Sequence, residues 1–125
     1  MDIKKISTQE APAAIGPYSQ AICAGGLLFT SGQIPLDPAG GEIVGEDAAA
    51  QAHQVMKNLC AVLNAAGSSP QRVIKTTCFL ADMADFAAFN SVYEQYLTEK
   101  PARSCIAAKA LPRGVLVEVE AVALL

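Results

Sequence analysis

Arg103 is the side chain whose setting in the sequence most clearly suggests chemistry. It lies in the segment Pro-Ala-Arg-Ser-Cys-Ile, residues 101–106, at the entrance of a predicted apolar strand. A planar guanidinium among small residues can hold a carboxylate through two parallel N–H···O hydrogen bonds. An ordinary edge-strand arginine, or one paired with Glu118 or Glu120, would have the same pattern. The residues alone leave these interpretations open.

Two carboxylates, Glu118 and Glu120, share one side of the last predicted strand with Leu116, Val122 and Leu124. Carboxylates are costly to bury unpaired among aliphatic side chains. Either they pair with a nearby arginine or lysine, or one of them acts as an acid or base with a shifted pKa. On the residues alone, a structural ion pair is the simpler interpretation.

Familiar nucleophile, phosphate and metal motifs are absent from the sequence. It has no G-x-S-x-G, G-x-x-x-x-G-K-[ST] or G-x-G-x-x-G segment. Its one histidine, His53, lies mid-helix beside a predicted apolar stripe, where a surface or boundary residue is far commoner than a catalytic base. The cysteines at 23, 60, 78 and 105 form no C-x-x-C pair. We expect buried thiols, with no metal site and no disulfide.

Composition narrows the class of protein. The chain has 125 residues, 52% apolar and 17% charged, which suits a single domain over 1–125. A net charge of −3 without a basic cluster argues against a nucleic-acid partner. No apolar run approaches the roughly 20 residues of a membrane-spanning helix, and residues 1–10 do not resemble a secretory signal. We therefore expect a cytoplasmic protein without membrane association.

Apolar periodicity predicts the elements that position these side chains. Strands are expected at 19–24 and 27–34, as a hairpin around Gly25–Gly26, and at 73–80, 103–108 and 115–124, with a loop at 35–45 that includes a short strand at 42–44. Helices are expected from Asp47 to 66, before Gly67, and from Asp82 until shortly before Pro101. This predicts an α+β fold: one mixed sheet of five to six strands, two helices on one face, and antiparallel final strands.

The same periodicity assigns inward faces to the helices. In the first helix the inward residues are Ala52, Val55, Met56, Leu59, Leu63 and Ala66, and Gln51, Gln54, Lys57, Asn58 and Asn64 lie largely off that face. In the second the inward residues are Met83, Phe86, Phe89, Asn90, Tyr93 and Leu97.

Both faces of the sheet are expected to be partly apolar. In strand 115–124 apolar residues occur at odd and even positions alike. In strand 73–80, Val73 and Phe79 are expected on one side, and Ile74, Cys78 and Leu80 on the other. Two helices cover only one face, so we expect a partner subunit on the other, in a closed symmetric homo-oligomer. The alternative is that the loop at 35–46 covers it.

Six segments together give the sequence a family resemblance. They are 13–20 (Ala-Ala-Ile-Gly-Pro-Tyr-Ser-Gln), 29–35 (Phe-Thr-Ser-Gly-Gln-Ile-Pro), 73–77 (Val-Ile-Lys-Thr-Thr), 89–93 (Phe-Asn-Ser-Val-Tyr), 101–105 (Pro-Ala-Arg-Ser-Cys) and 117–121 (Val-Glu-Val-Glu-Ala). Each is weak alone. In this order and spacing they resemble the reactive intermediate deaminase (RidA) family, also called YjgF, from about residue 7 to the C-terminus.

The resemblance implies a chorismate-mutase-like α+β fold and a homotrimer, with active sites between subunits and the other sheet faces forming a central barrel. It implies hydrolytic deamination of 2-enamino and 2-imino acids, such as 2-aminoacrylate/2-iminopropanoate and 2-iminobutanoate, to 2-keto acids and ammonia. This 2-iminobutanoate/2-iminopropanoate deaminase reaction protects pyridoxal-phosphate enzymes. It needs no cofactor.

The resemblance also implies roles for three charged residues. Arg103 would bind the substrate carboxylate. Glu118 would hold or deprotonate the water that adds to the imine carbon. Glu120 would be structural.

Four further positions match the lining of the family's pocket. Tyr18 would close over the substrate, and Ser31 would hydrogen-bond a polar end of it. Asn90 would do the same from its own helix or from the neighbouring subunit. Cys105 would contribute mainly its backbone groups. Residues 97–100 form a shorter segment than in some RidA proteins, which implies a more open pocket beside Arg103.

Two alternative functions remain from the sequence. One is a non-catalytic protein, either a chaperone or a binder of small carboxylates such as 2-keto acids. The other is an endoribonuclease or translation inhibitor, against which the charge and the lone histidine argue. Loss of Glu118 separates the first from an enzyme, because a binding protein would keep its ligand affinity.

Overall fold

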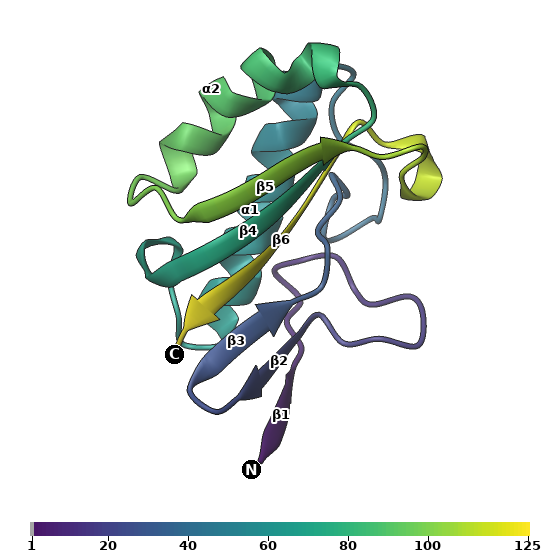
Figure 1. Ribbon diagram of the computed structural model, residues 1–125. Helices are drawn as coiled ribbons and strands as arrows, with labels where there is room; N and C mark the ends of the chain where they lie inside the picture. Colours follow the sequence, from purple (N-terminus) through teal and green to yellow (C-terminus); the bar gives the residue numbers. More distant parts are fainter. Residues whose placement is uncertain (1) are drawn as a thin grey trace.

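A computed structural model describes residues 2–125 of the protein. Over these residues the chain forms one six-stranded sheet, in the order β1-β2-β3-β6-β4-β5, and two α-helices (Figure 1). The strands are β1 (Ile3–Ile6), β2 (Ala21–Ala24), β3 (Leu27–Thr30), β4 (Val73–Leu80), β5 (Ala102–Ala107) and β6 (Val117–Leu124). The helices are α1 (Ala48–Ala65) and α2 (Phe86–Tyr96). Neighbouring strands are antiparallel except β4 and β5, so the predicted mixed α+β sheet is confirmed.

Strand pairing differs from the prediction at two places. The sequence did not predict β1, which pairs with β2 at the edge of the sheet. The last two strands run in opposite directions, as expected, but β4 lies between them. The reason is the crossover through α2, which returns the chain parallel to β4 on the outer side. Strand β5 is therefore an edge strand, and β6 is central.

The faces of β4 also differ from simple alternation. Cys78 and Leu80 point into the core as a pair, as predicted, but Ile74 is exposed and Val73 is buried. A register shift between Val73 and Lys75 changes the alternation at this end of the strand. The prediction that Ile74 shares a face with Cys78 and Leu80 is therefore wrong.

Helix α1 begins and ends at the predicted signals. The Asp47 carboxylate accepts a hydrogen bond from Ala50 N at 2.8 Å. Gly67 has φ +84° just past the end, a conformation that favours glycine. Of the predicted inward residues, Ala52, Val55, Met56, Leu59 and Leu63 are buried, and Ala66 packs against them.

Two polar residues predicted to lie off the inner face of α1 are in fact buried. Gln51 Oε1 accepts a hydrogen bond from Leu116 N at 2.8 Å. Asn58 Nδ2 donates to Leu36 O at 2.9 Å. These side-chain amides form hydrogen bonds with backbone groups that have no neighbouring strand to pair with. Helical periodicity gives no information about such bonds, so it did not predict that the two residues are buried.

Helix α2 follows a turn of 3-10 helix over Met83–Asp85, where Asp82 Oδ1 accepts from Ala84 N at 2.8 Å. Phe89, Tyr93 and Leu97 are buried as predicted. Met83 was predicted to point inward and is exposed, because it belongs to the 3-10 turn and not to the helix.

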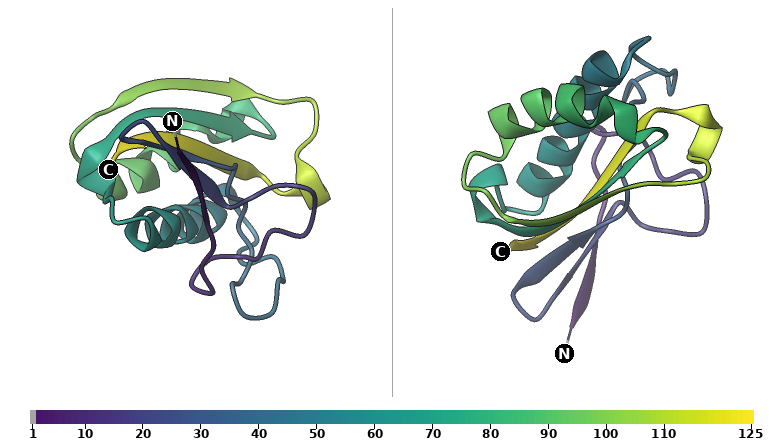
Figure 2. Two further views of the ribbon diagram at one scale, coloured as in Figure 1. Left: turned by 90° about the horizontal axis from the view of Figure 1, so that it is seen from below. Right: turned by 45° about the horizontal axis from the view of Figure 1, so that its top comes forward.

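Both helices cover the same face of the sheet (Figures 1 and 2). On the other face the side chains of Phe29, Ile74 and Ile106 are exposed, Ile106 by 51%. The loop at 35–46 leaves them uncovered, and its predicted strand is a single bridge between Leu36 and Ile43. Within residues 2–125, neither helix is long and apolar enough to cross a bilayer.

Candidate active site in two parts

Arg103 lies on edge strand β5 and is held by α2. It is in register with buried Thr76 of β4, so its side chain leaves the sheet on the helix-covered face. Its Nη1 donates to Asn90 Oδ1 at 2.7 Å. Its central carbon is 4.9 Å from the ring centre of Tyr93 and 5.4 Å from that of Phe86. These distances are typical of cation–π contacts.

We call the three residues of α2 that contact the guanidinium, Phe86, Asn90 and Tyr93, the Arg103 cradle. Their spacing along the helix explains why they contact it together. Phe86, Asn90 and Tyr93 are four and three residues apart, which places them on one stripe of α2 facing β5. Asn90 and Tyr93 line a cavity of about 380 Å³ whose wall also includes Lys100 and Arg103. Because Asn90 occupies only one guanidinium nitrogen, the others can donate to a carboxylate.

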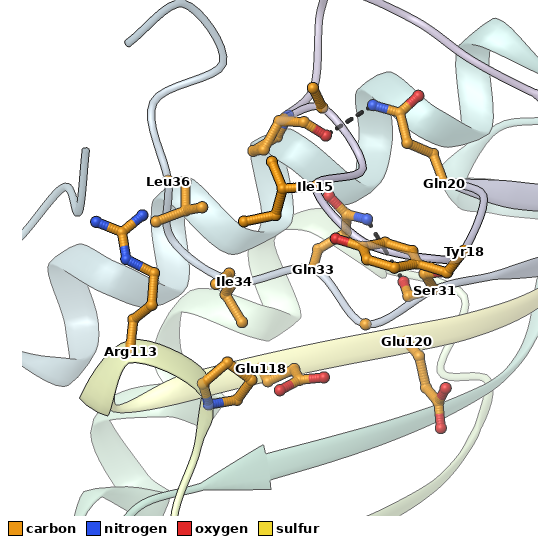
Figure 3. A pocket seen from close by; sticks show the side chains of 14 residues that line it. Ile15, Tyr18, Gln20, Ser31, Gln33, Ile34, Leu36, Arg113, Glu118 and Glu120 are labelled. Atoms are coloured by element: carbon orange, nitrogen blue, oxygen red, sulfur yellow. Dashed lines mark hydrogen bonds between the residues drawn. The ribbon is translucent and has the colours of Figure 1, made fainter. Parts of the chain in front are cut away.

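Glu118 lies in a different cavity, of about 550 Å³, on the far side of the sheet (Figure 3). Its wall includes Tyr18, Ser31, Gly32 and Arg113. Burial raises the pKa of the Glu118 carboxyl, and the charge of Glu120 raises it further. Raised pKa values bring a carboxyl closer to the range in which it can exchange protons at neutral pH.

The backbone beside Glu118 is a glycine for a steric reason. Gln33 and Val119 exchange hydrogen bonds at 2.8 and 3.1 Å, which lays residues 31–33 along β6. A Cβ on Gly32 would overlap the Glu118 carboxylate. Glycine therefore allows the chain to pass close to the carboxylate and fixes one side of its environment.

Tyr18 and Ser31 lie together on the same wall, with the Tyr18 ring beside Ser31 (Figure 3). Ser31 Oγ donates to Ser19 O at 2.5 Å, so its proton is already used and it would meet a ligand as an acceptor. Tyr18 is 52% exposed, which leaves its ring free to lie over a bound molecule.

The structure separates the predicted site residues into two groups on opposite faces of one sheet. Arg103, Asn90 and Cys105 lie on the helix-covered side, and Tyr18, Ser31 and Glu118 lie at the other cavity. Glu118 is in register with Phe79, and side chains alternate between the faces of a strand. Arg103 therefore forms no ion pair with Glu118 of its own chain. One small ligand cannot reach both through the sheet.

Cys105 is in register with Cys78 of β4. Burial raises the pKa of both thiols, that of Cys78 to about 12. Both are free thiols, and at neutral pH the protonated form prevails, which is a weak nucleophile. The expectation of buried cysteines holds for Cys23 and Cys78, whereas Cys60 and Cys105 are half-buried.

Three residues at these cavities were not predicted as site residues. Gly32 could have been recognised from the sequence, because it follows the predicted site residue Ser31 in the segment Thr-Ser-Gly-Gln. Tyr93 was predicted only as a core residue. Arg113, whose side chain is exposed, lies at the rim of the Glu118 cavity, opposite Tyr18, and donates to Gly41 O at 2.6 Å (Figure 3). Among the described residues, no three His, Cys, Asp or Glu side chains gather as metal ligands.

Comparisons with known proteins agree with the resemblance. Residues 8–125 match the family model described as Endoribonuclease L-PSP. RutC family protein slr0709 of Synechocystis sp. is 54% identical over 128 residues, covering 100% of this chain and 98% of that protein. The 2-iminobutanoate/2-iminopropanoate deaminase of Salmonella typhimurium is 47% identical over 124 residues, with 96% of each chain covered. The structure of E. coli TdcF with bound serine has a TM-score of 0.93, 45% identity and 98% coverage of both chains. The chain therefore belongs to the Endoribonuclease L-PSP family, the family of RidA, YjgF and RutC proteins.

Proposed function

We propose that this protein hydrolyses small 2-imino acids to 2-keto acids and ammonia, at sites where the Arg103 cradle of one copy meets the Glu118 cavity of the next. The observation that carries the proposal is the separation of these two groups on opposite faces of the sheet. Each group lines its own cavity. A second copy supplies the missing half, and the homotrimer that the sequence resemblance implies would repeat this contact around a closed ring.

The relatives support the choice of substrate. One is named 2-iminobutanoate/2-iminopropanoate deaminase, and the structure of another contains serine, an amino acid with a free carboxylate. Arg103 offers the planar donor that such a carboxylate requires. Bound there, a 2-imino acid would direct its C=N bond toward the Glu118 cavity of the neighbouring copy.

Glu118 would transfer the protons of the reaction. As a carboxylate it accepts a proton from water while the water oxygen bonds to the carbon of the protonated imine, and the C=N electron pair moves onto nitrogen, which becomes an amine. The protonated Glu118 then gives this proton to the amine nitrogen, and the C–N bond of the carbinolamine breaks to release ammonia. The hydroxyl proton of the carbinolamine returns to the carboxylate as the keto group forms, and Glu118 passes it to the ammonia, which leaves as ammonium. Burial and the charge of Glu120 raise the pKa of Glu118, which favours a role in which the carboxyl both accepts and returns a proton.

Position accounts for most of the expected rate enhancement. Imine hydrolysis is intrinsically fast, so orienting the carboxylate and placing one water are the effects required. Tyr18 would lie over the substrate and limit its contact with bulk water.

The ribonuclease alternative finds no comparable support in the site. His53 Nδ1 lies 2.9 Å from the Tyr96 hydroxyl and lines neither cavity. The larger cavity carries two carboxylates, which would repel RNA phosphates.

A coupled assay tests the proposal. A threonine dehydratase generates 2-aminocrotonate and 2-iminobutanoate, and their decay is followed by absorbance with and without this protein. We expect faster decay with the wild type and a loss of about 100-fold in Arg103→Ala, because two charge-assisted hydrogen bonds are removed. Arg103→Lys would recover little, since an ammonium lacks the planar fork.

Arg72→Ala is the matched control. Arg72 is exposed and donates to the carbonyl oxygens of Leu124 and Leu125, away from both cavities. It should keep full activity. A folded, oligomeric wild type that binds 2-ketobutanoate but leaves the decay unchanged would overturn catalysis in favour of the binding alternative.

A further inference from the structure

Tyr93 is fixed at both ends beside the Arg103 guanidinium. Its side chain is 7% exposed, and its hydroxyl shares a hydrogen bond of 2.7 Å with Thr76 Oγ1, on a residue that is fully buried. Its ring centre lies 4.9 Å from the central carbon of the guanidinium. We propose that Tyr93, anchored by Thr76, is a positioning residue that sets the direction in which Arg103 presents its donors to a substrate carboxylate. The inference rests on the proposed function of Arg103.

The contacts around Arg103 define its direction in space. Asn90 accepts from one guanidinium nitrogen, while the rings of Tyr93 and Phe86 attract the cation from the helix side. Of these three, only Tyr93 has a hydrogen bond to a strand other than the one that carries Arg103. Its ring also packs on Phe89, with 5.5 Å between ring centres, which restricts rotation. A long arginine side chain on an edge strand otherwise has many rotamers of similar energy.

Thr76 and Arg103 lie side by side on neighbouring strands, so the position of one is fixed relative to the other. Thr76 is the in-register partner of Arg103 across β4 and β5. The Thr76 hydroxyl thus binds Tyr93 of α2, and the Tyr93 ring in turn contacts the guanidinium of Arg103.

Core packing alone does not require these hydroxyls. Valine and phenylalanine would fill nearly the same volume, and replacing both partners of a buried hydrogen bond by apolar groups is often nearly neutral for stability. A buried hydroxyl pair adds direction, because a hydrogen bond fixes a distance and an angle that apolar contact leaves free. A fixed orientation of the Arg103 guanidinium is needed because two of its N–H groups must point at the two oxygens of one carboxylate.

Four variants test the inference. Thr76→Val removes the anchor, Thr76→Ser keeps the hydroxyl, and Tyr93→Phe removes the other partner while keeping the ring. Tyr96→Phe is the matched control, since Tyr96 lies on the same helix and its hydroxyl bonds His53 rather than Thr76. Calorimetric titration compares 2-ketobutanoate with 2-ketobutanamide, which lacks the carboxylate charge, and the coupled assay gives KM and kcat separately.

We expect Thr76→Val and Tyr93→Phe to weaken 2-ketobutanoate binding about 5- to 10-fold, as for one lost hydrogen bond that orients a charged donor. The affinity for 2-ketobutanamide should change less than about 2-fold, because binding of this ligand does not depend on the bidentate contact with a carboxylate. KM should rise more than kcat falls. Thr76→Ser should restore the wild-type preference for the carboxylate, and Tyr96→Phe should leave it unchanged.

Three results would overturn the inference. If the variants keep the wild-type preference for the carboxylate, the anchor does not position Arg103, and the proposed function still stands. If both ligands weaken equally and Thr76→Ser restores neither, the hydroxyl pair is structural only. If the wild type shows neither carboxylate preference nor turnover, the inference and the proposed function fall together.

Discussion

At the scale of single residues, the raised pKa of Glu118 links the stability of the fold to pH. Burial and the charge of Glu120 raise the pKa of its carboxyl above the ordinary value of 4.5. The folded state therefore holds this proton more tightly than the unfolded state does. Stability falls as pH rises from below 4.5 through the folded pKa, and the loss persists at neutral pH.

Glu118→Gln should consequently separate stability from activity. The neutral amide avoids the cost of a half-buried negative charge, so Tm at pH 7 should rise above that of the wild type, and the difference should vanish below pH 4.5. Turnover should fall about 100-fold or more, since general acid–base catalysis is lost. Thermal unfolding at several pH values and the coupled assay measure both effects. A lower Tm for the variant at pH 7 would contradict the cause assigned to the shift.

Gly32 tests whether the place of the Glu118 carboxylate matters. Gly32→Ala puts a methyl group where the carboxylate lies, so the carboxylate must move. A displacement of this size is expected to reduce kcat about 10- to 100-fold. Gly40→Ala is the control, because a Cβ there meets Asp37 at an ordinary 3.5 Å. Full turnover by a folded Gly32→Ala variant would show that this position of Glu118 is not required.

At the scale of elements, Gln20 fixes the loop that carries Tyr18. Its amide accepts from Thr8 N at 2.7 Å and donates to Pro12 O at 2.7 Å and Thr8 O at 3.1 Å, just before β2. Gln20 is buried, so these backbone groups depend on it in place of a partner strand.

Gln20→Ala should therefore destabilise the protein by about 1–3 kcal/mol, because buried backbone groups lose their partners. Hydrogen exchange at Thr8 should accelerate more than exchange in α1. Gln95→Ala is the matched control, since the exposed Gln95 amide donates to Ser91 O within α2. Denaturant unfolding compares the two variants, and equal stability would show that water replaces the Gln20 amide.

At the scale of the whole molecule, the proposed site needs two copies of the chain. Arg103→Ala and Glu118→Gln should each be inactive. When both are co-expressed in equal amounts with different tags, about a quarter of the interfaces in a random ring join an intact Arg103 half to an intact Glu118 half. The purified mixture should recover about a quarter of wild-type activity in the coupled assay.

A mixture of Arg103→Ala with Asn90→Ala is the control for this experiment. Both changes damage the same half of the site, so no interface becomes complete and activity should stay low. The exposed apolar face with Phe29, Ile74 and Ile106 is the surface that we propose for such assembly. Mixed assemblies of Arg103→Ala and Glu118→Gln without recovered activity would contradict a site shared between chains.

Most of the local structure follows from patterns that can be recognised in the sequence. Apolar periodicity located α1, β4 and β6, and Asp47 and Gly67 marked the ends of α1, because these signals depend on neighbours a few residues away. The motifs also named Arg103 and Asn90, which the fold brings within hydrogen-bond distance of each other. Their proposed roles in binding remain predictions.

The arrangement of these elements relative to one another became known only from the fold. It placed β6 between β3 and β4, and the irregularity near Val73 changed which side Ile74 faces. It put Arg103 and Glu118 on opposite faces of the sheet, and it joined Tyr93 to Thr76. Strand pairing and register depend on hydrogen bonds between residues far apart in the chain, and local patterns carry little information about them.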